Sequence, residues 1–475
     1  MRFLLASVAL AAIASAASAA PPQLTAAQRT AAHAMFEHVV NMPTVIGRHK
    51  VPEMAEYLAG QLKAAGFPAA DVHVVPYHTG SATTGDDETA ALIVRWRSGN
   101  AAAKPILLMG HMDVVEAKRE DSTTDPFVLT ERDGYYYGRG TIDMKDGITA
   151  ITQSLINLRA AGFKPRRDIV VLFTGDEETN GIGAKKGATE WLDMLGHPEF
   201  GLNADGGGGG FNADKSPAGF TMQTAEKTFA GYTLTVRNRG GHSSKPRKDN
   251  AIYSLAHALD KIEAYRFTPV LSETTRAYFA GRAKLEKGPL GDAMRRWLAN
   301  QNDGEAADMI EASESEVGLT RTRCVPTRLF AGHADNALPQ LATAMINCRI
   351  FPGVEPDAIK AEVEKIVADP TVVVTRNDDN PASLASPLRP DVTAAYTNAI
   401  HALHPGSPVF PEMSTGASDA RPFRVAGVPV YGVNGAWVQV PIDFRAHGKD
   451  ERIPVQSLYD NVVHWQLMLR DLAGK

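Results

Sequence analysis

The chain has 475 residues, of which 44% are hydrophobic and 22% charged, and its formal net charge at pH 7 is −5. This composition excludes a disordered chain, and the 2 cysteines are too few for a scaffold held together by disulfides. The mildly acidic balance also argues against a nucleic-acid partner, because Lys and Arg are not in excess. We therefore expect a globular protein of two or three domains.

The first 19 residues have the pattern of a secretory signal peptide. Arg2 provides a positive start, an apolar run covers residues 3–14, and small residues lead to Ala19, near which we expect cleavage. A buried N-terminal helix is the alternative interpretation. Because no other apolar run reaches the roughly 18 residues of a membrane span, we predict a secreted or periplasmic protein that makes no membrane contact after signal removal.

Strand patterns alternate with helix patterns after the signal peptide, which predicts an α/β fold with a mixed, mostly parallel sheet flanked by helices. Two solidly apolar strands, 106–109 and 169–173, have the composition of central strands covered on both faces. The other expected elements of this part are helices at 26–40, 54–65, 148–161 and 189–195 and strands at 72–77 and 91–97.

A stretch of different character follows. Its order is strand, helix, two strands, helix and strand, which is the order of a split βαβ sandwich. We therefore predict an α+β lid domain at 226–385, inserted between two segments, 20–225 and 386–475, of one larger domain. The expected lid elements are strands at 229–237, 321–330, 341–351 and 371–375, helices at 250–265 and 355–368, and a helical insertion near 270–320.

Cys324 and Cys348 lie twelve residues on either side of Asn336, in two predicted strands of a hairpin. Opposed positions in a hairpin are within reach of a disulfide. We nevertheless expect two separate buried thiols, because free Cys is among the most buried residue types.

Acidic and histidine side chains follow the ends of several predicted strands, where open α/β sheets place their sites. Each cluster alone is more simply explained as a turn or a solvated loop. Together, two histidines and several carboxylates in one domain form a ligand set for a pair of divalent metals, most naturally zinc. The clustered residues are His111, Asp113, Asp143, Glu177, Glu178, Asp205 and His447.

The motifs around these residues resemble, in order, those of the aminoacylase and carboxypeptidase family of di-zinc metallopeptidases. That family includes glutamate carboxypeptidase, carboxypeptidase S, acetylornithine deacetylase and succinyl-diaminopimelate desuccinylase. The resemblance covers nearly the whole mature chain and implies a metal domain with an inserted lid. The motifs are GHMDVV at 110–115, GRGTIDMKDG at 138–147, GDEE at 175–178, GGHSS at 240–244, STGASDAR at 414–421 and HGKDERI at 447–453.

The resemblance implies two zinc ions per subunit, with cobalt or manganese as possible substitutes. It assigns His111 and Asp205 to one ion and Glu178 and His447 to the other, with Asp143 as the bridging carboxylate. The run of glycines at 206–210 departs from the family pattern, and it is either a flexible rim or a tight packing strip.

The resemblance also assigns residues to catalysis and substrate binding. Glu177 is expected to be the general base, Asp113 to orient His111, and His242 to stabilise the oxyanion, either after lid closure or from a partner subunit. Four residues are expected to hold the substrate near its carboxylate: Arg349, Asn336, Gly416 and Ser418.

The resulting hypothesis is an exported exopeptidase, a carboxypeptidase or dipeptidase acting on small peptides with a free C-terminal carboxylate. An N-acyl-amino-acid deacylase is the alternative. Arg349 argues against an aminopeptidase because a guanidinium repels an ammonium, and Glu177 argues against a catalytically inactive metal protein. A homodimer formed through the lid domain is possible.

Overall fold

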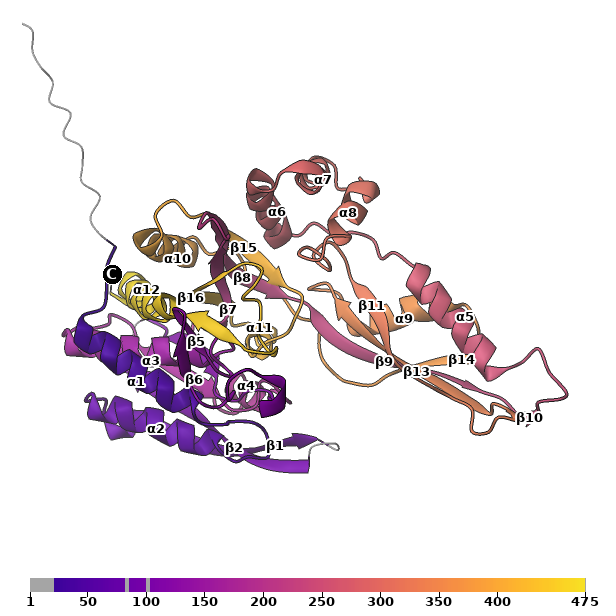
Figure 1. Cartoon of the computed structure of the whole chain (residues 1–475), viewed down its shortest axis with the longest axis horizontal. Coiled ribbons are helices and arrows are strands. Elements are labelled where there is room, and N and C mark those ends of the chain that lie inside the picture. Colours follow the sequence, from indigo (N-terminus) through magenta and orange to yellow (C-terminus); the bar gives the residue numbers. More distant parts are fainter. Residues whose placement is uncertain (1–20, 82–84, 100–102, 475) are drawn as a thin grey trace, which may run out of the picture.

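The computed structural model describes residues 21–81, 85–99 and 103–474, so the predicted signal peptide lies outside the described residues. Figure 1 shows a broad body from which a narrow arm extends. The body is built on an eight-stranded sheet, here called the main sheet, and the arm on a four-stranded sheet, here called the lid sheet. Within the described ranges, no helix is both long enough and apolar enough to cross a membrane.

The main sheet is mixed, as predicted, with the strand order β1-β2-β6-β3-β7-β16-β8-β15. Its centre is parallel, because β3 pairs in parallel with both β6 and β7, and β7 pairs in parallel with β16. The strands are β1 (Val72–Ser81), β2 (Gly85–Trp96), β3 (Ile106–His111), β6 (Ile169–Thr174), β7 (Phe200–Phe211), β8 (Pro217–Glu226), β15 (Val409–Ser414) and β16 (Val430–Gln439).

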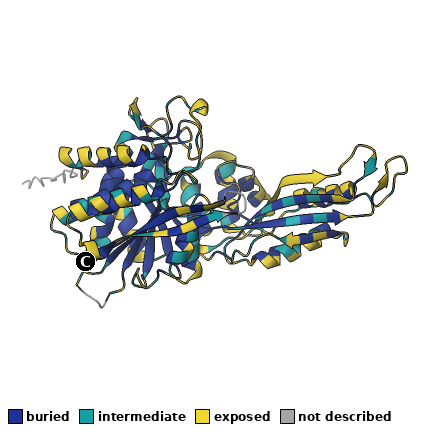
Figure 2. Cartoon of the chain, turned by 90° about the horizontal axis from the view of Figure 1, so that it is seen from below, coloured by how far each residue is buried: buried dark blue, intermediate teal, exposed yellow. Residues whose placement is uncertain are grey.

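Helices cover both faces of the main sheet, and its apolar residues form two cores (Figure 2). The larger core lies under α1 (Ala26–Val40), α2 (Val51–Ala64), α3 (Lys145–Ala160), α10 (Pro390–Leu403) and α12 (Val455–Ala473). The smaller core lies under α4 (Ile182–Gly187) and α11 (Ala420–Val425).

The helix predicted at 189–195 is wrong, because this stretch forms turns and the helix α4 lies just before it. Helix α4 ends at Gly187, where a Cβ atom would lie 2.6 Å from the side chain of Leu172 and 2.9 Å from that of Phe423. The apolar spacing that suggested a helix reflects burial alone, since Trp191 and Leu195 belong to the smaller core.

The glycine run is a packing strip inside β7, where this strand lies between β16 and β8. A Cβ atom on Gly209 would lie 2.4 Å from the ring of Phe220. Gly207 has a φ of +82°, and a Cβ atom there would lie 2.7 Å from the carbonyl oxygen of Gly432. These contacts exclude side chains and argue against a flexible rim.

The lid sheet is antiparallel, with the order β11-β13-β9-β14, and two helices cover one of its faces. Its elements follow the predicted split βαβ order: β9 (Thr228–Arg237), α5 (Ala251–Ala264), β11 (Arg323–Ala331), β13 (Leu341–Ile350), α9 (Pro356–Val367) and β14 (Val372–Arg376). The helical insertion forms α6 (Glu273–Leu285), α7 (Gly288–Ala299) and α8 (Gly304–Glu311).

The insertion packs on the main sheet rather than in the core of the lid sheet. Its helices share a separate core with Phe410 and Met413 of β15 and with Ala225 of β8. Figure 1 shows these helices above β15, at the root of the arm. The outer strand β11 therefore remains largely exposed along its length, with Val325, Leu329 and Phe330 more than half exposed.

Our expectation of two separate thiols is wrong, because Cys324 and Cys348 form a disulfide. The register of β11 and β13 places these residues directly opposite each other, with a Cα separation of 4.0 Å. The side chain of Cys348 points into the lid core, so the disulfide ties the outer strand to the core.

Candidate active site

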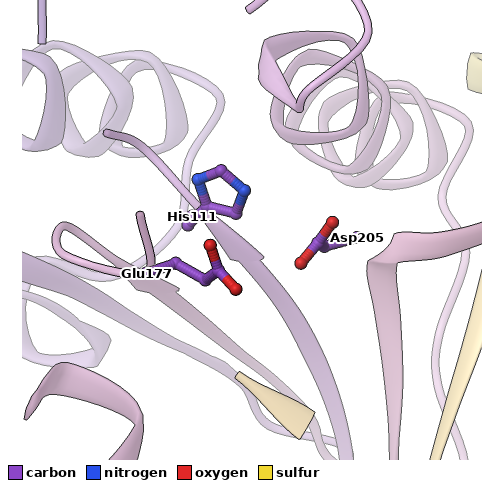
Figure 3. Close-up of side chains that lie close together, drawn as sticks. All are labelled: His111, Glu177 and Asp205. Carbon is purple, nitrogen blue, oxygen red and sulfur yellow. The ribbon is translucent and has the colours of Figure 1, made fainter. Parts of the chain in front are cut away.

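The ends of three neighbouring strands bring His111, Glu177 and Asp205 together. His111 is the last residue of β3, Glu177 follows β6, and Asp205 lies within β7. Because β3 pairs in parallel with both of the other strands, these positions share one edge of the sheet. One donor atom from each side chain lies within 4.8 Å of the others, and Figure 3 shows the three side chains around a common space.

A second group adjoins the first through Asp143. One oxygen of Asp143 lies 3.2 Å from Nε2 of His111, and the other lies 3.1 Å from Nε2 of His447. Nε2 of His447 is also 2.9 Å from Oε1 of Glu178. Asp143 therefore lies between the two histidines and offers one oxygen to each, as a bridging ligand would.

The cluster has the electrostatics of a cation site. Burial and the neighbouring Asp205 carboxylate raise the pKa of Glu177 well above its usual value. Burial also raises the pKa of Asp205, to about 7. Hydrogen bonds to Asp143 and Glu178 raise the pKa of His447 to about 10. Each of these shifts favours additional positive charge at the cluster.

Two histidines and four carboxylates gathered in this way fit a pair of divalent ions. The donors are imidazole nitrogen and carboxylate oxygen, which suit zinc, cobalt and manganese. Glu177 groups with His111 and Asp205, whereas Asp143 and Glu178 form the other group with His111. The residues that the resemblance distributes between two ions thus form one continuous cluster.

Asp113 positions a backbone segment as well as a histidine. Nδ1 of His111 lies 3.0 Å from the backbone oxygen of Asp113 and 3.5 Å from its carboxylate. The carboxylate accepts hydrogen bonds from the backbone N–H groups of Glu177 and Glu178, at 3.1 and 3.0 Å. Asp113 thereby fixes His111 and both glutamates relative to one another.

The remaining carboxylate of the GDEE motif has a structural role. Asp176 is buried and accepts hydrogen bonds from the hydroxyls of Tyr77 and Thr79, at 2.6 and 2.8 Å. It also accepts from the backbone N–H groups of Ile182 and Gly183 at the start of α4. Asp176 anchors the loop so that the next two side chains face the cluster.

His242 and Asn336 lie away from the cluster, at the far tip of the arm. His242 belongs to the short strand β10 (Gly241–His242), which pairs with β12 (Ala337–Leu338), and the backbone oxygen of Asn336 accepts from Ser243 N–H. Figure 1 shows β10 at the end of the arm opposite the main sheet. The structure therefore does not bring these two residues to the site of their own chain.

Arg349 lies at the opposite end of the lid sheet, near the main sheet. It is opposite Phe229 in the register of β13 and β9, and its guanidinium carbon is 5.3 Å from the centre of that ring. Eight residues of strand separate Phe229 from Arg237, which corresponds to about 27 Å. One substrate amide cannot therefore contact both Arg349 and His242 of the same chain in this conformation.

The loop that contains Gly416 and Ser418 connects β15 to α11. The backbone N–H of Gly416 donates to Oγ of Ser414 at 3.0 Å. The Ser418 hydroxyl donates to the buried carboxylate of Glu226 at 2.8 Å. The hydroxyl of Ser418 is therefore engaged within its own chain.

Arg139 and Glu451, which were not predicted as site residues, form a buried ion pair of 2.7 Å beside Asp143. Both residues lie inside the quoted motifs GRGTIDMKDG and HGKDERI. An arginine in one motif and a glutamate in the other could have suggested an ion pair. Sequence spacing, however, does not show that the two motifs meet in the fold.

Comparison with known proteins places the chain in a family. The sequence pattern of the family described as peptidase family M20/M25/M40 matches residues 107–471. A Dictyostelium discoideum protein named probable carboxypeptidase S-like 2 is 29% identical over 77% of this chain and 71% of its own. The human protein named N-fatty-acyl-amino acid synthase/hydrolase PM20D1 is 30% identical over 76% of this chain and 72% of its own.

Solved structures show the same fold at low identity. A metallo-carboxypeptidase of the M20 family from Sulfolobus solfataricus aligns with a TM-score of 0.67 at 16% identity, over 92% of this chain and 98% of that chain. A Bacillus subtilis protein described as a dinuclear metal-binding peptidase aligns with a TM-score of 0.57 at 12% identity, over 94% and 98% of the two chains. The sequence match and the clustered ligands together show that this chain belongs to peptidase family M20/M25/M40 and is an enzyme of that metal-dependent family of peptidases and amidohydrolases.

Proposed function

We propose that the protein is an exported exopeptidase, a carboxypeptidase or dipeptidase, that hydrolyses the amide bond next to a free carboxylate in small peptides. Arg349 supports this proposal most directly. Its side chain is half-buried, and burial lowers its pKa. Among the described residues no carboxylate pairs with it, so a substrate carboxylate would supply the missing partner.

The residues of the cluster have complementary roles in this reaction. We propose that His111, Asp143, Glu178, Asp205 and His447 hold two zinc ions, with cobalt or manganese as substitutes. When bound, the two ions supply an activated water at neutral pH and Lewis acidity at the scissile carbonyl. The Glu177 carboxylate takes the proton from the attacking water and transfers it to the leaving nitrogen.

Replacing Arg349 with alanine tests how the substrate carboxylate is recognised. We expect kcat/KM for a dipeptide to fall about 100-fold, because the variant lacks a charge-assisted contact worth roughly 3 kcal/mol. The same dipeptide with an amidated C-terminus should be hydrolysed equally poorly by both enzymes. The assignment fails if the variant still discriminates between the free and the amidated peptide as the unmodified enzyme does.

Hydrolysis of N-acyl amino acids is the second candidate function. These substrates also present a carboxylate beside the scissile amide, and several relatives are named N-fatty-acyl-amino acid synthase/hydrolase. Ile442 and Phe444 are 49% and 73% exposed, just before His447 in the chain. They flank Asp443, which is buried and ion-paired with Arg452, so two exposed apolar side chains precede His447 in the same loop.

One substrate panel separates the two candidates. The zinc-loaded protein, expressed without residues 1–19, is assayed with dipeptides and with amino acids that carry short and long N-acyl chains. Faster hydrolysis of the dipeptides supports the exopeptidase, whereas kcat/KM that rises with acyl length supports the N-acyl-amino-acid hydrolase. If the protein hydrolyses neither dipeptides nor N-acyl amino acids, both proposals are contradicted.

We further propose a homodimer in which His242 of one subunit completes the site of the other. The remoteness of His242 from its own cluster and the exposed apolar residues of β11 support this arrangement. A mixture of His242→Ala and Glu177→Ala proteins, each inactive alone, should regain up to a quarter of the unmodified activity after subunit exchange. A monomer in light scattering, or no recovery in a mixed dimer, would contradict the proposal.

Export is the final part of the proposal, and it rests on the sequence of residues 1–19. Expression of the full chain in a bacterium, followed by fractionation and N-terminal sequencing, tests both the compartment and cleavage near Ala19. Protein that stays in the cytoplasm and retains Met1 would contradict the proposed export.

A further inference from the structure

The two halves of the metal cluster are supported in different ways. His111 and Asp205 lie on β3 and β7, so the centre of the main sheet fixes their backbones. Asp143 and His447 lie on loops, and His447 has a positive φ of 61° and a side chain that is 51% exposed. These loop residues need another source of rigidity if they are to hold a cation.

The buried pair of Arg139 and Glu451 joins the two loops. Nη1 of Arg139 lies 2.7 Å from Oε2 of Glu451, and the side chains are only 5% and 2% exposed. Arg139 also donates from Nη2 to the backbone oxygen of Gly448, the residue after His447, at 3.3 Å. One guanidinium thus holds the loop of His447 at two points.

Glu451 reaches from its own loop to the backbone of the other. Its Oε1 accepts hydrogen bonds from the backbone N–H groups of Ile142 and Asp143, at 3.0 and 3.3 Å. Its backbone oxygen accepts from the N–H of Gly138 at 3.1 Å. The two strands beside these contacts, β5 (Tyr135–Tyr137) and β17 (Arg452–Pro454), pair directly.

We propose that Arg139 and Glu451 are positioning residues that hold Asp143 and His447 as one unit, and that they thereby set the affinity of the half of the metal site that the loops supply. Neither side chain is placed as a ligand. Both act through hydrogen bonds to the loops that carry Asp143 and His447. The strands β3 and β7 hold His111 and Asp205 without help from this pair. The inference rests on the proposed two-metal site and makes the two ions unequal in their dependence on this pair.

Replacing Glu451 with glutamine tests the proposal through metal content. The purified protein is equilibrated with zinc over a range of buffered free concentrations, and bound zinc per chain is counted. The unmodified protein should hold two equivalents. Glu451→Gln should bind one equivalent about 10- to 100-fold more weakly, the usual effect of removing a residue that supports a ligand, and should weaken the other, whose ligands His111 and Asp205 lie on β3 and β7, clearly less.

Activity gives a second readout. Because the weakened site becomes occupied at high zinc concentration, kcat of Glu451→Gln should recover when zinc is added. Equal affinities for both equivalents in the variant and the unmodified protein would overturn the proposal. Weakening of both equivalents to the same extent would also overturn it, because the proposal requires the ion held from β3 and β7 to be affected less. If the unmodified protein fails to bind two equivalents, the proposed two-metal site is wrong, whatever the variant does.

Two further variants keep the test independent of folding. Arg139→Met combined with Glu451→Gln removes both buried charges but retains an oxygen that can accept from Ile142 and Asp143. This double variant leaves no unpaired buried charge but lacks the Arg139 contacts to the loop of His447, so it should still bind the second equivalent more weakly than the unmodified protein does, and normal affinity for both equivalents would contradict the positioning role. Asp168→Asn is the control, because it breaks the 2.7 Å pair with Arg95 before β6, at the strand end opposite the site, and should leave zinc binding unchanged.

Discussion

Replacing Glu177 with glutamine should lower kcat about 1,000-fold while leaving metal content and KM nearly unchanged. The amide side chain would keep the size and one hydrogen-bonding oxygen of the carboxylate but could not accept a proton, and general base catalysis of this kind contributes about 10²- to 10⁴-fold. The Glu177 carboxylate is well placed for this role, because burial and Asp205 raise its pKa well above the usual range. Steady-state kinetics of the zinc-loaded variant give both constants.

Glu190→Gln provides a matched control for this prediction. Glu190 lies thirteen residues after Glu177 in the chain, is 62% exposed and pairs with Lys186 on the surface, so its loss should not change kcat. Zinc content must be measured alongside the rate, because Glu177 also groups with His111 and Asp205. A variant that retains kcat with zinc bound would rule out Glu177 as the base, and one that loses zinc would identify Glu177 as a ligand instead.

Much of the main sheet follows from local patterns in the sequence. The strands 106–109 and 169–173 are recognisable because unbroken apolar runs suit strands that are buried on both faces, and the structure extends them only to His111 and Thr174. The ends of such strands then predict where polar side chains gather. His111 and Glu177 can therefore be placed at the same edge of the sheet from the sequence alone.

One strand of the main sheet, β7, is hidden by its composition. β7 contains the glycine run, which in isolation indicates a loop. Only the close approach of β8 and β16 explains why side chains are absent there, and that packing is not encoded in β7 itself. The same limit applies to the disulfide, because the register of β11 and β13 decides whether Cys324 and Cys348 face each other.

At the candidate site, too, only part of the arrangement follows from the sequence. Residue types and motif order suggest which side chains bind metal, but they do not show which loops support one another. Asp113 reaches the backbone of Glu177 and Glu178, and Glu451 reaches Asp143. Residues 308 positions apart become neighbours only through the folded sheet, so these supporting contacts have no local signal.

Without its metals, the protein should become less stable as the pH rises from 5.5 to 8. Burial raises the pKa of Asp205 in the folded chain to about 7, above its unfolded value of 3.8, so the folded form binds a proton that the unfolded form releases. The shift in Glu177 has the same sign. His447, with a folded pKa of about 10, also loses stabilisation above pH 6.5. Each pKa unit corresponds to about 1.4 kcal/mol.

Bound zinc should reverse this trend, because the ions take the place of the protons and bind more tightly as the ligands lose them. Thermal unfolding of the chelated and the zinc-loaded protein is therefore measured at pH 5.5 and at pH 8. The difference in midpoint temperature between the two forms should be larger at pH 8. Asp205→Asn should raise the midpoint of the chelated protein at pH 8 and remove most of the gain from zinc. A chelated protein whose midpoint is constant or rises over this range would show that its carboxylates do not repel one another, and the case for a two-cation site would lose its electrostatic basis.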